Sequence, residues 1–267
     1  MSRNFDLLRR AKKGQALFLP QINHSQVNKN VPYGPNEEPA PTETVSPERR
    51  VPWPSQALNG TALEQLTKLV RRVFVYANSS APRTVSFSSV EGSGSTEMCL
   101  QAGMTLASQG TGSVCIVDAN LRAPWLHRLL EIESAPGLTD AMIHPDSMKE
   151  CVVRIGDRGN LWAVPAGSLN SHAEAVLTSD RLRARISELK EQFDFVLIDV
   201  PAVNSHADAV LIGQMTDGLI LVLEANFTRR ETARSAKEAL EATNINLLGA
   251  ILNNRTFPIP EALYRWL

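Results

Sequence analysis

The sequence predicts an α/β protein built on a doubly wound, mostly parallel β-sheet with helices on both faces, a three-layer sandwich. Two observations lead to this fold class. Short apolar runs, typical of strands buried on both faces, alternate with segments of helical periodicity from about residue 57 onward. A chain of 267 residues with 43% hydrophobic content is also long enough to bury one large core of this kind.

By composition the chain divides into three regions. Residues 1–19 place basic side chains among apolar ones and predict a short basic amphipathic segment, a brief helix. Residues 20–56 hold eight prolines and few apolar residues, a composition that predicts a disordered linker. Residues 57–267 carry the alternating patterns, so we expect the whole α/β domain there.

The first strand of the expected sheet leads into a glycine turn. Residues 84–87 are extended and largely apolar, residues 88–96 contain two glycines among serines, and Cys99, Ala102 and Leu106 follow at helical spacing. This strand, turn and helix have the form of a phosphate-binding loop. In such a loop backbone N–H groups surround phosphate oxygens, and the positive helix N-terminus adds to the attraction.

The loop departs from the usual pattern at one position. Against G-x-x-x-x-G-K-[ST], Ser89 takes the place of the first glycine, Gly94 that of the second, and Thr96 supplies the hydroxyl that faces a metal ion. Ser95 stands where the pattern has lysine. Whether the protein is an enzyme therefore depends on Ser95, because the lysine is the cation that the loop itself provides.

Further strands are predicted by apolar runs, several of which end in a polar residue. The runs are residues 114–117, 161–164, 195–198, 219–223 and 247–252. Asp118, Asp199 and Asn253 directly follow three of them. Helical periodicity fills the gaps, for example over residues 177–189 and 228–243.

Right-handed crossovers bring the carboxyl ends of parallel strands to one edge of the sheet, where ligands bind in this architecture. Ser88, Asp118, Asp199 and Asn253 all fall at that edge. Taken alone, each aspartate is equally consistent with a helix cap or a turn. Together with the glycine loop they match the needs of a Mg-nucleotide, since Mg²⁺ is held by a hydroxyl, phosphate oxygens and carboxylates. The sequence therefore predicts a phosphate-loop nucleotide fold.

Composition argues against several other classes of protein. The formal net charge of -1 gives no electrostatic basis for binding nucleic acid. The three cysteines lack C-x-x-C or histidine-paired spacing and predict buried free thiols in a reducing compartment, and the histidines lack metal spacing too. Because no apolar run approaches the roughly 20 residues of a membrane span, we expect a cytoplasmic protein whose membrane association, if any, is peripheral and at the inner face of the cell membrane.

Four segments have the form of motifs. Residues 113–124 read S-V-C-I-V-D-A-N-L-R-A-P, residues 193–202 read F-D-F-V-L-I-D-V-P-A, residues 248–253 read L-G-A-I-L-N, and residues 1–8 read M-S-R-N-F-D-L-L. The first three resemble the second Walker-type motif, the Walker B segment and an L-G-x-V-L-N strand of the bacterial tyrosine kinases of capsule and exopolysaccharide synthesis, relatives of the MinD and ParA ATPases. The fourth resembles a short N-terminal motif of several members.

This resemblance implies an ATP-dependent cytoplasmic kinase that works with a membrane polysaccharide co-polymerase, a Wzz-like chain-length regulator. It also implies autophosphorylation on a tyrosine-rich tail and assembly into rings, hence a homo-oligomer. By the resemblance, ATP and Mg²⁺ are the cofactors and Asp118 and Asp199 the catalytic carboxylates. Thr96 joins both aspartates as a metal ligand, and Asn253 contacts the nucleotide base.

Several positions depart from the family pattern. Ser95 replaces the loop lysine, Asn120 replaces the second aspartate of D-x-D, and the tail after residue 256 holds one tyrosine, Tyr264. The family's oligomerising E-x-x-R-x-x-R helix is poorly matched near Glu64. Loss of the lysine removes a charge-assisted hydrogen bond worth roughly 1.5–3 kcal/mol, so we expect binding to survive better than turnover.

The nucleotide-binding residues expected on this basis are the loop amides, assisted by an arginine and the end of the last strand. They are Gly92, Ser93, Gly94, Ser95, Thr96, Arg122 and Asn253, with Arg83 as the alternative to Arg122. Two hypotheses remain open. One is a degenerate kinase that regulates the co-polymerase, and the other is an active kinase or ATPase whose missing lysine comes from elsewhere. A MinD-like partitioning ATPase is disfavoured, because Val90 and Glu91 stand where those enzymes have an extra lysine.

Overall fold

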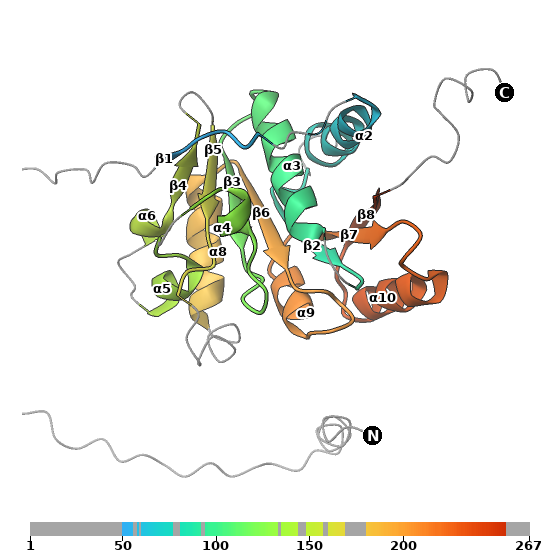
Figure 1. Ribbon diagram of the computed structural model, residues 1–267. Coiled ribbons are helices and arrows are strands. Elements are labelled where there is room, and N and C mark those ends of the chain that lie inside the picture. Colours follow the sequence, from blue (N-terminus) through green and yellow to red (C-terminus); the bar gives the residue numbers. More distant parts are fainter. Residues whose placement is uncertain are drawn as a thin grey trace, which may run out of the picture. The chain divides into compact units, whose positions relative to one another are not determined.

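A sheet of eight strands, in the order β1-β4-β5-β3-β6-β2-β7-β8, crosses the part of the chain that the computed structural model describes (Figure 1). The described residues are 50–55, 58, 60–76, 81–91, 94–132, 135–143, 148–156, 160–168 and 180–254. Gly92, Ser93, Tyr264 and the predicted segment 1–19 lie outside them.

Six of the described strands match the predicted apolar runs and extend most of these runs by a residue or two, whereas β1 and β4 match none of them. They are β1 (Arg50–Val51), β2 (Thr84–Ser89), β3 (Val114–Asp118), β4 (Val153–Ile155), β5 (Leu161–Val164), β6 (Phe195–Val200), β7 (Gly218–Glu224) and β8 (Leu247–Asn253). Every neighbouring pair is parallel except β4 with β5. The prediction of a doubly wound, mostly parallel sheet is therefore confirmed.

Helices cover both faces of this sheet (Figure 1). They are α2 (Gly60–Val70), which continues as a π-helix (Arg71–Val75), α3 (Ser95–Ser108), α4 (Leu126–Leu129), α5 (Leu138–Ile143), α6 (Met148–Cys151), α8 (Asp180–Gln192), α9 (Asp208–Gly213) and α10 (Arg230–Ala242). One hydrophobic core includes side chains of α2, α3 and α4, and the second includes those of α5, α6, α8, α9 and α10. Strand residues alternate between these two cores, as period-2 geometry requires.

Two strands were not predicted. The three-residue strand β4 carries Arg154 at its centre, which interrupts the apolar pattern, and it runs antiparallel to β5. Strand β1 lies inside the segment predicted as a linker, and it pairs with β4. Trp53 follows it and packs against Gly156, where an added Cβ would lie 3.3 Å from the Trp53 ring. The sheet therefore takes up residues from the proline-rich segment.

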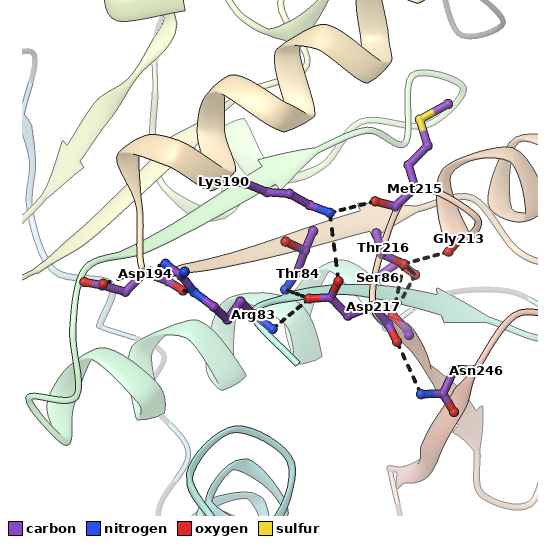
Figure 2. Close-up of polar contacts among 11 residues, drawn as sticks. Arg83, Thr84, Ser86, Lys190, Asp194, Gly213, Met215, Thr216, Asp217 and Asn246 are labelled. Carbon is purple, nitrogen blue, oxygen red and sulfur yellow. Dashed lines mark hydrogen bonds and ion pairs between the residues drawn. The ribbon is translucent and has the colours of Figure 1, made fainter. Parts of the chain in front are cut away.

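The amino-terminal edge of the sheet is held by a polar network around Asp217 (Figure 2). One Asp217 carboxylate oxygen accepts hydrogen bonds from the backbone N–H groups of Arg83 and Thr84, both at 2.8 Å. The other lies 3.9 Å from the Lys190 ammonium. This carboxylate therefore holds the start of β2 beside the start of β7.

Candidate functional site

The loop between β2 and α3 ends at Gly94, a position where a larger residue would be strained. Gly94 caps the helix with φ +104°, a backbone region that favours glycine. A Cβ on Gly94 would also lie 2.7 Å from Nδ2 of Asn253, at the end of β8. The structure thus places Asn253 against the phosphate loop. Ser95 and Thr96 then open α3 with buried side chains.

Two buried carboxylates lie side by side beneath this helix end. Asp118 and Asp199 are paired in register across β3 and β6. Alternation turns both toward α3, because Ile116 and Leu197, two residues earlier on each strand, belong to the core that contains α3. The Thr96 hydroxyl donates a hydrogen bond of 2.6 Å to Oδ2 of Asp199. The predicted convergence of Thr96, Asp118 and Asp199 is therefore present.

Burial makes it costly to charge these carboxylates. It raises the pKa of Asp199 to about 8, and repulsion from Asp118 adds to the rise. Hydrogen bonds from Thr96 and Ser95 act in the opposite direction. Burial likewise raises the pKa of Asp118 to about 6. The largest causes of these shifts are burial, hydrogen bonds and, for Asp199, the neighbouring carboxylate, whereas a loop lysine would favour the charged form of these carboxylates and lower both pKa values.

Asp118 also organises its own loop. Its carboxylate accepts hydrogen bonds from the backbone N–H groups of Asn120, at 3.2 Å, and of Trp125 and Leu126, both at 3.1 Å. The last two bonds cap the start of α4. Asn120 turns the same loop, since its side-chain oxygen accepts from the Ala123 N–H at 3.3 Å. Asp118 therefore holds both ends of the loop that leads into α4.

Arg122 is held by a residue that the sequence did not single out. Its Nε donates to Oδ2 of Asp208, the first residue of α9, at 2.7 Å. The two positions are 86 residues apart in the chain. The sequence does show an acidic residue, Asp208, in the first turn of the helix that follows the Walker B segment. Its spacing does not indicate that Arg122 is its partner.

The expectation that Arg83 serves the site is wrong. Arg83 precedes β2, whereas the phosphate loop follows it, and six strand residues separate the two edges by roughly 20 Å. Its guanidinium donates instead to the backbone oxygen of Asp194 at 2.8 Å, beside the network around Asp217 (Figure 2).

The oxygen donors present fit Mg²⁺. Thr96 offers a hydroxyl, and Oδ1 of Asp199 is buried without a hydrogen-bond partner in the described part of the chain, which suits a hard cation. Within those same residues no three His, Cys, Asp or Glu side chains converge to form a metal site by themselves. Cys99, Cys115 and Cys151 are buried free thiols, as predicted. Burial raises the pKa of Cys99 well above its usual range, and Asp199 adds to this rise, so the thiol is inert.

Comparison with known proteins decides the family. The family model described as "Cellulose biosynthesis protein BcsQ" matches residues 84–249. Tyrosine-protein kinase YwqD of Bacillus subtilis is 30% identical over 168 residues, which cover 63% of this chain and 70% of YwqD. The chain belongs to the bacterial tyrosine-kinase family. A further member, the putative tyrosine-protein kinase CapB of Staphylococcus aureus, is 25% identical over 60% of this chain and 70% of its own length.

Solved structures of this family share the fold. The chimerical protein CapA2B2 superposes with a TM-score of 0.69 at 20% identity, covering 78% of this chain and 94% of that one. The kinase domain of Escherichia coli tyrosine kinase ETK superposes with a TM-score of 0.62 at 17% identity, covering 79% and 92%. In the described residues, no helix combines the length and the apolar character needed to cross a bilayer.

Proposed function

We propose that this member of the family is a cytoplasmic phosphate-loop protein of exopolysaccharide or capsule synthesis that binds Mg-ATP but has lost most of its kinase activity. One observation carries the proposal. Ser95, with its buried side chain, opens α3 at the position where the loop pattern has lysine. Phosphoryl transfer depends almost wholly on positioning and charge neutralisation, so the absence of this cation weakens catalysis directly.

The rest of the constellation supports retained binding. Thr96 and Asp199 are in direct hydrogen-bonding contact, and Asp118 is aligned beside them. In this proposal Asp118 and Asp199 are the catalytic and metal-linked carboxylates that the family resemblance implies. The loss of one charge-assisted hydrogen bond, about 1.5–3 kcal/mol, weakens affinity by roughly 10- to 150-fold at 1.4 kcal/mol per factor of ten. Weak binding without efficient turnover suits a regulator better than an enzyme.

The regulated partner in this proposal is a membrane polysaccharide co-polymerase, a Wzz-like chain-length regulator. The basic and apolar residues of segment 1–19 suit contact with such a partner or with an anionic inner membrane surface, where each basic residue adds about 1 kcal/mol. The protein would then be peripheral to the membrane and assemble with copies of itself beneath the co-polymerase.

A second function is favoured by the same preserved geometry. Because Thr96 donates to Asp199 and Asp118 is paired with Asp199 in register, an active tyrosine autokinase or ATPase with a rearranged phosphate loop is the alternative. It requires another cation to act where Ser95 stands.

The two functions differ in turnover and in their response to restored charges. Calorimetric titration with Mg-ATP and an autophosphorylation assay would be run on the full chain, on Ser95→Lys with Asn120→Asp, and on Ser95→Ala as a matched control. We expect weak binding and no phosphotyrosine above background for the parent and the control, and at least tenfold tighter binding for the double variant. Autophosphorylation by the parent, abolished by Asp199→Asn, would establish the alternative. A double variant that binds no better than the parent would refute the role given to Ser95.

A further inference from the structure

The ion pair between Arg122 and Asp208 joins two loops at the carboxyl edge of the sheet. Arg122 lies in the loop after β3, four residues beyond Asp118, and Asp208 opens α9 after the loop that follows β6. The Arg122 Nε to Asp208 Oδ2 distance is 2.7 Å, and the two side chains are 31% and 10% exposed. Asp208 is thus nearly buried, whereas water reaches the arginine.

The backbone on both sides of this pair is fixed. Asp118 binds the N–H groups at both ends of the loop that carries Arg122. The loop before Asp208 is tied to the end of β2, since the Ser88 hydroxyl donates to the Pro201 oxygen at 2.7 Å and the Val203 N–H donates to the Ser89 oxygen at 2.9 Å. Because these hydrogen bonds hold the backbone on both sides of the pair, a change of partner for Arg122 would take place by rotation of its side chain.

The same edge contains the positive end of α3 and lacks the loop lysine. Arg122 follows Asp118 by four residues, and Asp118 is in register with Asp199. Asp199 contacts Thr96 on the first turn of α3. An arginine side chain suits phosphate oxygens well, because its planar donors are always charged and bind bidentately. While Asp208 holds the guanidinium, its charge is largely compensated.

We propose that Asp208 withholds Arg122 from phosphate groups bound at the N-terminus of α3, so that the Arg122–Asp208 ion pair and nucleotide phosphates compete for one guanidinium. This inference rests on the proposed nucleotide binding. Arg122 is the cation that partly replaces the missing lysine, and Asp208 is a positioning residue that acts through Arg122. By linkage, a bound nucleotide loosens the contact between the β3 loop and α9 to the same extent that this contact weakens nucleotide affinity.

The test is a calorimetric titration of the full chain and its variants with Mg-ATP. Asp208→Asn, which keeps the side-chain volume and removes the charge, is expected to bind at least fivefold more tightly than the parent. Arg122→Ala is expected to bind at least fivefold more weakly, and the variant with both substitutions should bind as weakly as Arg122→Ala alone. Arg122→Lys, which keeps the charge but lacks Nε, should recover most of the affinity lost in Arg122→Ala.

Glu238→Gln is the matched control, because it also releases an arginine, Arg234, from a carboxylate, on the exposed surface of α10. It should leave affinity unchanged. Asp208→Ala provides a second charge-removing variant if Asp208→Asn does not fold, as judged by its melting temperature. Unchanged affinity in a folded Asp208 variant, or tightening that persists in the Arg122→Ala background, overturns this inference and leaves the proposed function standing. Absence of binding by the parent and by every variant overturns the proposed function, and this inference with it.

Discussion

Replacement of Asp199 by asparagine should change the pH dependence of stability more than any other single substitution in the site. The pKa of this carboxyl is about 8 in the folded chain against an ordinary value of 3.8. At a pH between these two pKa values, the carboxyl is protonated in the folded state and ionised in the unfolded state. The stabilisation from this proton is fully present below about pH 3.8 and is lost as the pH rises toward 8. An asparagine side chain at this position does not titrate, so the variant should lose less stability as the pH rises toward 8.

The expected size follows from the pKa difference. One pKa unit corresponds to about 1.4 kcal/mol, and a single site with these two values loses roughly 3–4 kcal/mol of unfolding free energy between pH 5 and pH 8. Asp118, whose pKa is about 6, contributes in the same direction and remains in both proteins. The difference between parent and variant reports Asp199 together with its repulsion from Asp118, and the variant should gain about 3 kcal/mol relative to the parent over this interval.

Urea denaturation at half-unit steps from pH 5 to pH 8, without nucleotide or Mg²⁺, measures the effect. Asp194→Asn is the control. Asp194 is exposed, and hydrogen bonds from Ser113 lower its pKa, so its contribution is lost only as the pH falls below about 4. It should leave the slope between pH 5 and pH 8 unchanged. Parallel curves for the parent and Asp199→Asn would refute the claim that a buried, uncompensated carboxylate lies beneath α3.

Gly94→Ala should destabilise the fold by about 1–3 kcal/mol in thermal melts, because the φ of Gly94 is positive and Asn253 occupies the space of the new Cβ. Full rescue by Asn253→Ala would show that the backbone angle costs nothing. Asp217→Ala leaves the N–H groups of Arg83 and Thr84 without their acceptor and should cost about 2–4 kcal/mol in urea, with Mg-ATP affinity preserved. A preserved urea midpoint would contradict this. Trp53→Ala should lower the melting temperature by a few degrees if β1 is part of the stable sheet, and an unchanged value would count against it. Deletion of residues 2–19 should release the protein from the membrane fraction of cells that contain its partner, without shifting the melting temperature; retention there would place the anchor elsewhere.

The central strands could be predicted because burial on both faces leaves a continuous apolar run in the sequence. The run before Asp199 shows this well, since β6 lies between β3 and β2 and contacts both cores. Strand β4 gave no such signal, because three residues with Arg154 at the centre resemble a loop. Strand β1 was hidden by neighbouring prolines, and its pairing depends on a partner about 100 residues later.

The candidate site was predictable to the extent that its residues lie at the carboxyl ends of strands or on the helix that follows one. Thr96, Asp118 and Asp199 converge because parallel strands end at one edge. The Arg122–Asp208 pair was not predictable, since it depends on how two loops fold back toward each other. The role given to Arg83 failed for a simple geometric reason, because a residue before a strand lies at the opposite edge from a residue after it.

The strand order also has a consequence for how the protein is made. Strands β2 and β3 are consecutive in the chain but are not neighbours in the sheet, because β6 is inserted between them. The Thr96–Asp199 contact accordingly spans 103 positions. A nascent chain that has emerged only as far as α8 therefore exposes two apolar strands whose common neighbour has not yet been synthesised, and unpaired strand edges of this kind favour aggregation. During its synthesis the protein should depend on chaperones until β6 emerges from the ribosome.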